Sequence, residues 1–251
     1  MDILRIDGSP GNVLRKQMTT SMPQELHLAV EQDLCLPHEA FPNVFKRRFA
    51  LFIKRMLDIV LSAALHILLA PLFVIIVIAI KLDSAGPAIF IQERWGIHTR
   101  RFKMFKFRTL RHNSPDPHAR YEMIECDPRI TCIGSFLRRT SLDELPQLTN
   151  VLLGTMSIVG PRPLVPWESE QCLAHHRERF SVKPGITGLS QVYARNAVNL
   201  SARSDLDLVY VKQWSLLLDL KILLISPFKI VAQDDIYPRK KHYNNTASNE
   251  E

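Results

Sequence analysis

The adjacent carboxylates Asp143 and Glu144 form the part of this sequence best suited to chemistry. Leucine and valine residues recur behind them at three- and four-residue spacing, which predicts a helix running toward Gly154. Ser141, three residues before Glu144, fits a capping box at the start of that helix. Because Pro146 fits poorly deeper inside a helix, Asp143 is the alternative cap. Either start places both carboxylates where the helix dipole favours negative charge, so we expect Asp143 to be ionised at neutral pH, as a nucleophile must be.

Acidic residues in a first helical turn are also ordinary caps, so the pair alone does not define a site. The residues after the pair predict further elements that could lie near it. After Gly154, a short apolar run predicts a strand, and residues 160–163 predict a rigid turn that carries Arg162. A guanidinium in such a turn can hold an anion beside the acidic pair. Arg138 and Arg139 come shortly before the pair and could fold back on the same anion.

An apolar run without formal charge, residues 59–80, has about the length that crosses a bilayer, roughly 20 residues. It lacks the polar face of a soluble helix, because Ser62 and His66 are its clearest polar side chains. Basic residues flank it on both sides, which disagrees with a straight span under the positive-inside tendency. Pro71 can kink the helix, so the pattern favours a helix that enters and leaves by the same face. A simple spanning anchor is the alternative.

Two alternating segments, residues 88–92 and 102–109, predict strands. In the second, Lys103, Lys106 and Arg108 alternate with phenylalanines, so that cations lie on one side of an apolar support. An ordinary solvated strand face would show the same alternation. The pattern therefore indicates a basic strand without fixing its use.

The apolar segment 216–231 is interrupted by charged residues and by Pro227, so it is too broken to span a membrane. It predicts a pair of amphipathic helices in the membrane interface, with Trp214 and Phe228 as anchors. A soluble core helix is the alternative. Shorter helices are predicted at 23–36, 168–180 and 205–214, and a loop at 112–125.

The net charge of +7 suits a nucleic acid, an anionic membrane surface or a phosphorylated substrate. A nucleic-acid binder would explain this charge but not the apolar run 59–80, and no nucleic-acid binding motif occurs. Dinucleotide, Walker, serine-hydrolase and zinc-protease signatures are also missing. The four cysteines form no C-x-x-C pair, which predicts free thiols in a reducing cytoplasm.

Several stretches of the chain resemble, in order, the bacterial sugar transferase family of monotopic phosphoglycosyl transferases. The most specific is SLDELPQLTNVLLGTMSIVGPRP, residues 141–163, which contains the acidic pair. The others are KRMLDIVLS (54–62), GPAIFIQERWG (86–96), FKMFKFRTL (102–110), DPRITCIGSFLRRTS (127–141) and VKPGITGLSQV (182–192). The resemblance covers about residues 50 to 235, and several motifs in register make chance similarity a poor explanation.

This resemblance implies transfer of a sugar 1-phosphate from a UDP-sugar to a polyprenyl phosphate such as undecaprenyl phosphate, with release of UMP. That reaction is the first membrane step in building a lipid-linked glycan for exopolysaccharide, O-antigen, capsule or glycoprotein. It implies Asp143 as the nucleophile of a covalent aspartyl-phosphosugar intermediate and Glu144 as a ligand of Mg²⁺. A non-catalytic, membrane-anchored scaffold of a polysaccharide assembly system is the alternative.

The resemblance also assigns roles to other positions, with Pro71 as the break in a re-entrant membrane helix. Candidate substrate-binding residues are Lys106, Arg108, Arg138, Arg162, Arg195 and Asp207. Two positions depart from the usual pattern, since Thr99 and Ala194 stand where the family commonly has glycine. These departures affect the turn before residue 101 and the backbone beside Arg195 rather than the chemistry.

We therefore expect a helix-rich, mixed α/β fold: a small cytoplasmic catalytic domain with an N-terminal re-entrant membrane helix and interfacial amphipathic helices. The expected parts are an extension at 1–45, the membrane helix at 46–83, the catalytic domain at 84–236 and a polar, disordered tail at 237–251. The expected location is the bacterial inner membrane, with the catalytic domain on its cytoplasmic face. Expected partners are the UDP-sugar, polyprenyl phosphate and membrane lipid but no nucleic acid, and a homodimer is left open.

Overall fold

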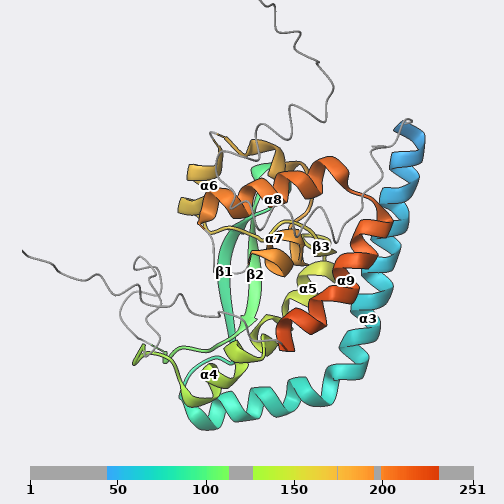
Figure 1. Ribbon diagram of the computed structural model, residues 1–251. Coiled ribbons are helices and arrows are strands. Elements are labelled where there is room, and N and C mark those ends of the chain that lie inside the picture. Colours follow the sequence, from blue (N-terminus) through green and yellow to red (C-terminus); the bar gives the residue numbers. More distant parts are fainter. Residues whose placement is uncertain (1–43, 113–126, 174, 195–198, 232–251) are drawn as a thin grey trace, which may run out of the picture.

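A computed structural model describes residues 44–112, 127–173, 175–194 and 199–231 (Figure 1). The helix predicted at 23–36, the tail, Arg195 and most of the loop predicted at 112–125 lie outside these residues. Helices predominate over short strands, as expected for the mixed fold. The elements are α3 (Val44–Asp83), β1 (Ile89–Trp95), β2 (Arg101–Phe107), α4 (Cys132–Arg139), α5 (Gln147–Leu152), β3 (Ser157–Val159), α6 (Pro166–Leu173), β4 (Gly185–Thr187), α7 (Leu189–Tyr193), α8 (Leu200–Gln213) and α9 (Leu216–Val231).

The two predicted strands near residue 100 form an antiparallel hairpin, β1–β2, in which Ile89 pairs with Phe107 and Trp95 with Arg101. The turn between them puts Thr99 at a φ of 60°, in the left-handed region that favours glycine. Glycine would adopt this backbone angle without strain, which fits the glycine that the family resemblance leads us to expect at position 99. Threonine keeps the turn here, and the hairpin forms with it.

A second, two-stranded sheet joins β3 to β4 in parallel, with Ser157 opposite Gly185 and Val159 opposite Thr187. The two backbones come very close where β3 ends and β4 begins. A Cβ added to Gly185 would lie 2.1 Å from the backbone nitrogen of Gly160, so this contact requires glycine. The Gly160 N–H donates to Thr187 O at 2.9 Å and the Gly185 N–H donates to Pro161 O at 2.9 Å, which fixes the turn that follows β3.

Helix α3 is 40 residues long, and Figure 1 shows it bent, with one part beside α9 and the rest turning under the domain toward α4. Pro71 lies inside it and interrupts its backbone hydrogen bonding, a common cause of a helix bend. The segment Arg47–Asp83 is long and apolar enough to cross a membrane, and an 18-residue window within it has a mean hydropathy of 2.8. Its exposed side chains include Phe52, Val60, Ile67, Leu68 and Ile75.

Two apolar cores hold α3 and the small domain together. The larger one lies among α7, α8, α9, α5 and β3, where Val151, Leu206 and Leu218 are fully buried. The smaller one packs Ile76 and Ile80 of α3 against β2 and α4. The bent helix is thus a packed part of the domain on its inner side and an apolar surface on its outer side.

The C-terminal segment is one helix, α9, so the predicted pair of helices is wrong. Its inner face buries Leu218 and Ile222, and apolar residues also occupy its outer face, where Phe228 is 75% exposed. Trp214 is buried and its indole N–H donates to an Asp219 carboxylate oxygen at 3.1 Å. The prediction that Trp214 anchors the protein in a membrane interface is therefore corrected, because its polar atom is bound inside the domain.

Candidate active site

The acidic pair lies in a single 3₁₀ turn, Leu142–Glu144, and not in the first turn of a long helix. Ser141 adopts a left-handed φ of 57° and its side chain makes no capping bond, so the predicted capping box is wrong. Helix α5 begins only after Pro146, whose backbone lacks the N–H that a helix interior needs. The carboxylates therefore lie on a tight connection between α4 and α5, before the first turn of α5.

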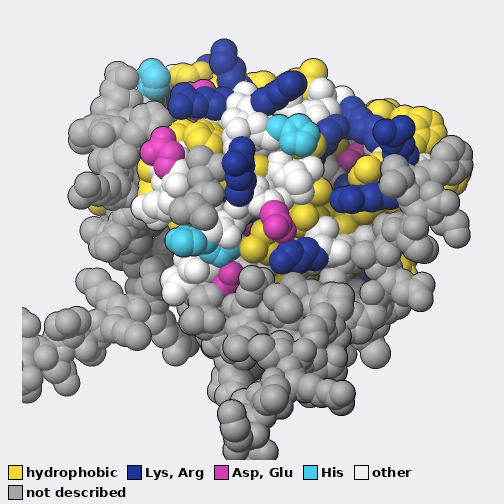
Figure 2. Space-filling model, turned by 90° about the horizontal axis from the view of Figure 1, so that it is seen from above, with side chains coloured by type: hydrophobic (Ala, Val, Ile, Leu, Met, Phe, Trp, Pro, Cys, Tyr) yellow, Lys and Arg dark blue, Asp and Glu magenta, His cyan; other side chains and the backbone are white. Residues whose placement is uncertain are grey.

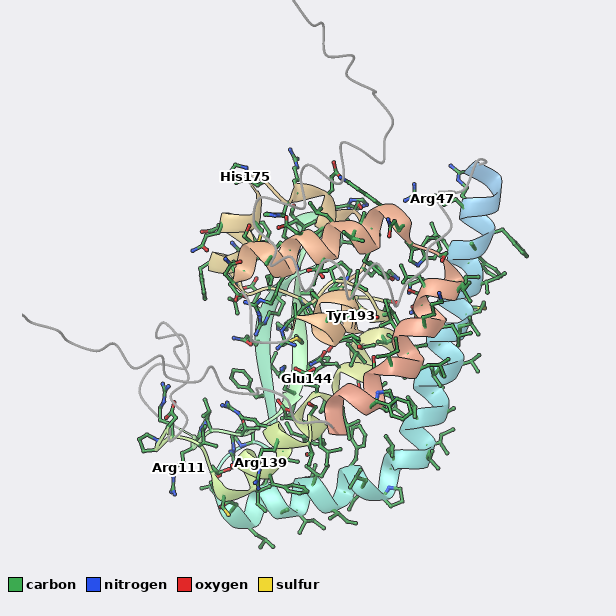
Figure 3. All side chains as sticks on the ribbon, viewed as in Figure 1. Arg47, Arg111, Arg139, Glu144, His175 and Tyr193 are labelled. Atoms are coloured by element: carbon green, nitrogen blue, oxygen red, sulfur yellow. The ribbon has the colours of Figure 1, made fainter. Side chains whose placement is uncertain are left out.

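Two cations from distant parts of the chain meet the acidic pair. The Lys106 Nζ on β2 lies 2.6 Å from Glu144 Oε1 and 3.9 Å from Asp143 Oδ2. The Arg162 Nη2, on the turn after β3, lies 3.6 Å from the same Glu144 oxygen. Figure 3 shows Glu144 in the middle of the domain, near β2. The structure thus brings together the acidic turn, the basic strand and the glycine–proline turn that the sequence singled out.

The surroundings of the two carboxylates shift their pKa values in opposite directions. Burial alone would raise the pKa of Glu144, but the Lys106 and Arg162 charges outweigh it and lower this pKa to about 2. Burial raises the pKa of Asp143, which Lys106 opposes and the Glu144 charge reinforces. The helix start expected at this pair does not form, and burial shifts the pKa of Asp143 upward. Asp143 is the more basic carboxylate, and hence the better nucleophile once it is ionised.

Arg138 lies in the last turn of α4 and also faces this site. Its Nε donates to Thr109 Oγ1 at 2.8 Å, and its charge lowers the pKa of Asp143. Arg139 is exposed and lies on α4, below Glu144 in Figure 3. Of the two neighbouring arginines, Arg138 is the one oriented toward the acidic pair.

A small, open hollow lies beside the acidic turn. Three of its lining residues are cationic: Arg94, Lys106 and Arg162. Arg94 donates to the Pro163 carbonyl at 3.1 Å, which connects the hairpin to the turn that carries Arg162. A small hollow with three cations and a carboxylate at its edge is suited to a phosphate group that must react there.

Two other predicted substrate residues are occupied inside the protein. Arg108 is buried, and its Nη2 donates to Ser84 O at 2.6 Å, which fastens the end of α3 to β2. Asp207 is also buried and accepts hydrogen bonds from Arg179 and, at 2.7 Å, from the Ser190 hydroxyl. Arg179 in turn donates to Arg162 O at 3.0 Å. Direct substrate contacts by these two residues stay predictions, while their observed contacts support the site's framework.

Polar residues on the inner side of α3 are contacts that sequence reasoning missed. Arg55 donates to Val151 O at 2.6 Å and to Leu152 O at 2.9 Å, at the C-terminal end of α5. His66 Nε2 lies 3.1 Å from Thr149 Oγ1 on the same helix. The sequence pattern shows Arg55 only as one of the basic residues that flank the apolar run, and His66 only as a polar residue within it. The one available signal was their helical spacing with Asp58, which places polar side chains along one side of α3.

The described part of the chain contains no group of three or more His, Cys, Asp or Glu side chains arranged to hold a metal ion. Cys132 and Cys172 are free thiols there, which agrees with the expectation for those two cysteines. A metal at the acidic pair would therefore need oxygen ligands from a substrate as well. Mg²⁺ is commonly bound in this way, by one or two carboxylates together with phosphate oxygens.

Comparison with known proteins gives the same assignment as the motifs. The sequence model of the family described as "Bacterial sugar transferase" matches residues 49–233. An undecaprenyl-phosphate glucose phosphotransferase of Komagataeibacter xylinus is 42% identical over 69% of this chain and 35% of its own length. A UDP-glucose:undecaprenyl-phosphate glucose-1-phosphate transferase of Escherichia coli strain K12 is 41% identical over 70% of this chain and 40% of its own length.

The chain thus spans well under half the length of these two relatives. A shorter relative, the exopolysaccharide production protein PSS of Rhizobium leguminosarum bv. phaseoli, is 39% identical over 69% of this chain and 92% of its own length. The region that matches the family contains most of α3, the acidic turn and its described cationic neighbours. From the family match and this nearly complete alignment, the chain belongs to the bacterial sugar transferase family.

Proposed function

We propose that this protein transfers a sugar 1-phosphate from a UDP-sugar to a polyprenyl phosphate, releasing UMP and leaving a polyprenyl diphosphosugar. The observation that carries the proposal is the half-buried pair Asp143–Glu144, with Lys106 and Arg162 beside it, on a domain packed against an apolar helix. The names of the relatives, which act on undecaprenyl phosphate, support the same substrates. Such a product is the first lipid-linked intermediate of glycan assembly.

In the first step an Asp143 carboxylate oxygen attacks the β-phosphorus of the donor. A bond forms between the carboxylate oxygen and this phosphorus, and the bond from the phosphorus to the bridging oxygen breaks. UMP leaves with the bridging oxygen and the electron pair of the broken bond. Lys106 and Arg162 offset negative charge on the phosphoryl oxygens, and Arg138 adds a third positive charge near Asp143. Glu144 orients both Lys106 and Arg162 before the donor arrives.

In the second step an oxygen of the polyprenyl phosphate attacks the same phosphorus and displaces the Asp143 carboxylate. The aspartate is regenerated, and the phosphosugar is now joined to the lipid through a diphosphate. Because the two steps are separate, the water-soluble donor departs as UMP before the membrane-embedded acceptor reacts. The raised pKa of Asp143 suits a nucleophile, while the low pKa of Glu144, about 2, suits a permanently charged neighbour.

Mg²⁺ is the proposed cofactor, and the acidic pair can provide the one or two carboxylate ligands that Mg²⁺ usually takes from a protein. Glu144 would hold the ion together with donor phosphate oxygens, and the ion would supply further neutralisation of the diphosphate charge. Lys106 already lies 2.6 Å from Glu144 Oε1, so this lysine would share Glu144 with the ion. Lys106 would then face the same negative region of the donor as the ion.

We place the protein at the cytoplasmic face of the bacterial inner membrane, where the donor and the lipid acceptor meet. The outer side of α3 would lie in lipid, and its bend would return both ends of the helix to one face. Figure 2 shows Lys and Arg side chains spread over the face of the domain that lies at the top of Figure 1. A positively charged surface of this kind raises the local concentration of an anionic donor.

The topology can be tested with single cysteines at Arg48 and Ala85, two exposed positions on opposite sides of the apolar run. In a background whose four native cysteines are serine, both should react only with reagent applied from the cytoplasm. Pro71→Ala restores a backbone hydrogen bond and removes a cost of about 3 kcal/mol, which favours a straight helix. We expect one flank of that variant to become reactive from the periplasm. Opposite-side labelling without the substitution would establish a spanning helix instead.

The function itself is tested by UMP release from a panel of UDP-sugars, with membrane-bound protein, undecaprenyl phosphate and Mg²⁺. We expect release with at least one sugar and formation of the matching diphosphosugar lipid. Release that is equal in vesicles without the protein would show a contaminating hydrolysis. Absence of release with every donor would overturn the transferase and favour the non-catalytic scaffold.

A further inference from the structure

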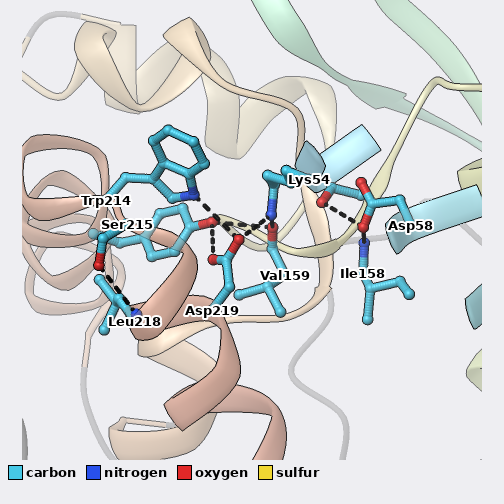
Figure 4. Close-up of polar contacts among 10 residues, drawn as sticks. Lys54, Asp58, Ile158, Val159, Trp214, Ser215, Leu218 and Asp219 are labelled. Atoms are coloured by element: carbon cyan, nitrogen blue, oxygen red, sulfur yellow. Dashed lines mark hydrogen bonds and ion pairs between the residues drawn. The ribbon is translucent and has the colours of Figure 1, made fainter. Parts of the chain in front are cut away.

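Lys54 and Asp219 form a buried ion pair between α3 and α9, the two helices with apolar outer faces (Figure 4). The Lys54 Nζ lies 2.6 Å from Asp219 Oδ2 and also donates to Val159 O at 3.0 Å. One ammonium group therefore joins three separate elements: α3, α9 and strand β3. Its remaining exposure is 15% of the side chain, so water competes little for these contacts.

Asp219 is the centre of this cluster. The Tyr210 hydroxyl donates to Asp219 Oδ1 at 2.8 Å and also lies 3.1 Å from Val159 O. The Trp214 indole adds a third donor to the same carboxylate. A buried ion pair adds little stability compared with apolar residues of the same volume, so its distinctive contribution is a fixed geometry. Here it fixes α3 and α9 relative to the Val159 carbonyl.

Asp58, one helical turn after Lys54, binds the rest of the same strand. Its Oδ1 accepts the Ile158 N–H at 3.0 Å and the Ser157 hydroxyl at 3.2 Å. Every residue of β3 is thus bonded to a side chain of α3. The position of α3 consequently fixes the position of β3.

Strand β3 leads directly into the active site. Gly160 and Pro161 separate Val159 from Arg162, and hydrogen bonds to β4 hold both of them. A proline and a tightly packed glycine leave this connection little freedom. A shift of Val159 must therefore move Arg162, whose Nη2 lies 3.6 Å from Glu144 Oε1.

We propose that Lys54 and Asp219 are positioning residues that set Arg162 against the acidic pair according to how α3 and α9 are seated on a lipid surface. When both helices rest on lipid, the ion pair is held, Val159 is fixed and Arg162 keeps its place. When α9 moves away from α3, Lys54 and Tyr210 lose the Asp219 carboxylate that holds them against the Val159 carbonyl, and Arg162 moves with the loosened strand. The inference rests on the proposed function for its kinetic readout, but its structural readout needs no activity.

The structural test is hydrogen exchange of peptides covering residues 157–162, measured on full-length protein in detergent and in phosphatidylethanolamine–phosphatidylglycerol vesicles. We expect slower exchange in vesicles for the unmodified protein. In Asp219→Asn the amide keeps its shape but loses the charge, so exchange should be faster and no longer respond to vesicles. Lys54→Arg keeps a cation at this position and should retain most of the response to vesicles.

Lys212→Ala is the matched control. Lys212 lies on α8, and its Nζ forms a more exposed ion pair with Glu178 Oε2 at 3.9 Å. The substitution should leave exchange of residues 157–162 unchanged. If Asp219→Asn also leaves it unchanged, or if the vesicle response persists in that variant, the positioning role is wrong. Faster exchange spread evenly over the whole domain would show general destabilisation and would equally contradict it.

The kinetic test combines Asp219→Asn with Arg162→Lys in a double-mutant cycle. Displacement of Arg162 should lower kcat/KM for the UDP-sugar about tenfold in the otherwise unmodified protein. The same substitution should cost much less when Arg162 is already lysine, because residues that act through one another are not additive. Fully additive losses would remove Arg162 from the connection. Normal exchange behaviour without UMP release in the unmodified protein would instead count against the proposed function alone.

Discussion

Asp143→Asn is expected to abolish UMP release and to leave no phosphosugar on the protein. An amide is a poor nucleophile toward phosphorus, and no other described carboxylate except Glu144 lies beside Lys106. Glu144 cannot substitute easily, because its pKa of about 2 makes it the weaker base. Asp143→Glu should also be severely impaired, since a shift on the order of 1 Å in a reacting group can cost about a hundredfold.

The deciding measurement is mass spectrometry of protein quenched in acid after incubation with UDP-sugar alone. We expect about one phosphosugar per protein, on the peptide that contains Asp143, and an equal amount of UMP. Glu93→Gln is a suitable control, because it also changes a carboxylate to an amide but lies in an exposed ion pair with Arg101. It should form the adduct normally. Ternary-complex kinetics with no adduct would mean that the lipid phosphate attacks the donor directly.

The features that the sequence predicted well depend on local patterns. Alternation of apolar and polar residues produced the hairpin β1–β2 and its basic strand, because a strand repeats every two residues. Glycine and proline marked the turn that carries Arg162, and that turn does lie beside the acidic pair. Hydropathy found the long apolar helix that contains Pro71. In each case a few neighbouring residues were sufficient to determine the element.

The errors arose where local patterns compete or where distant contacts decide. The capping-box pattern predicts that the helix begins at Ser141, whereas Pro146 favours a later start. The structure shows the later start, with α5 beginning at Gln147. Lys54 and Asp219 are 165 positions apart, so no spacing rule could pair them. Asp219 also accepts a hydrogen bond from the Trp214 indole, which gives this tryptophan a polar partner inside the domain. Hydropathy alone treats that tryptophan as an interfacial residue.

Glu144→Gln is expected to have the second-largest effect, because Glu144 has two functions in the proposed site. It holds Lys106 at 2.6 Å and lies 3.6 Å from Arg162, so the amide would release both cations from their present positions. It would also remove a charged oxygen that a hard cation prefers as a ligand. We expect activity to fall and the Mg²⁺ concentration for half-maximal activity to rise by about tenfold.

A Mg²⁺ titration of UMP release checks this result, with Glu93→Gln again as the control for an exposed carboxylate. The cofactor role of Glu144 is supported if the variant needs more Mg²⁺ and regains part of its activity at high concentration. If the titration curve is unchanged while activity falls, Glu144 only orients Lys106 and Arg162. In that outcome the metal ligand must be sought elsewhere in the site.

The same substitution makes a separate prediction for the dependence of activity on pH. Asp143 must be ionised to attack, and burial raises its pKa above the usual 3.8, so activity should decline with falling pH before 3.8 is reached. The Glu144 charge contributes to that rise, and Glu144 is ionised throughout this range because its own pKa is about 2. Glu144→Gln removes the like charge and frees Lys106 to approach Asp143, and both changes lower the pKa of Asp143. The acid limb of kcat/KM should therefore move to lower pH in the variant, and a limb that stays in place or moves upward would contradict the coupling between the two carboxylates.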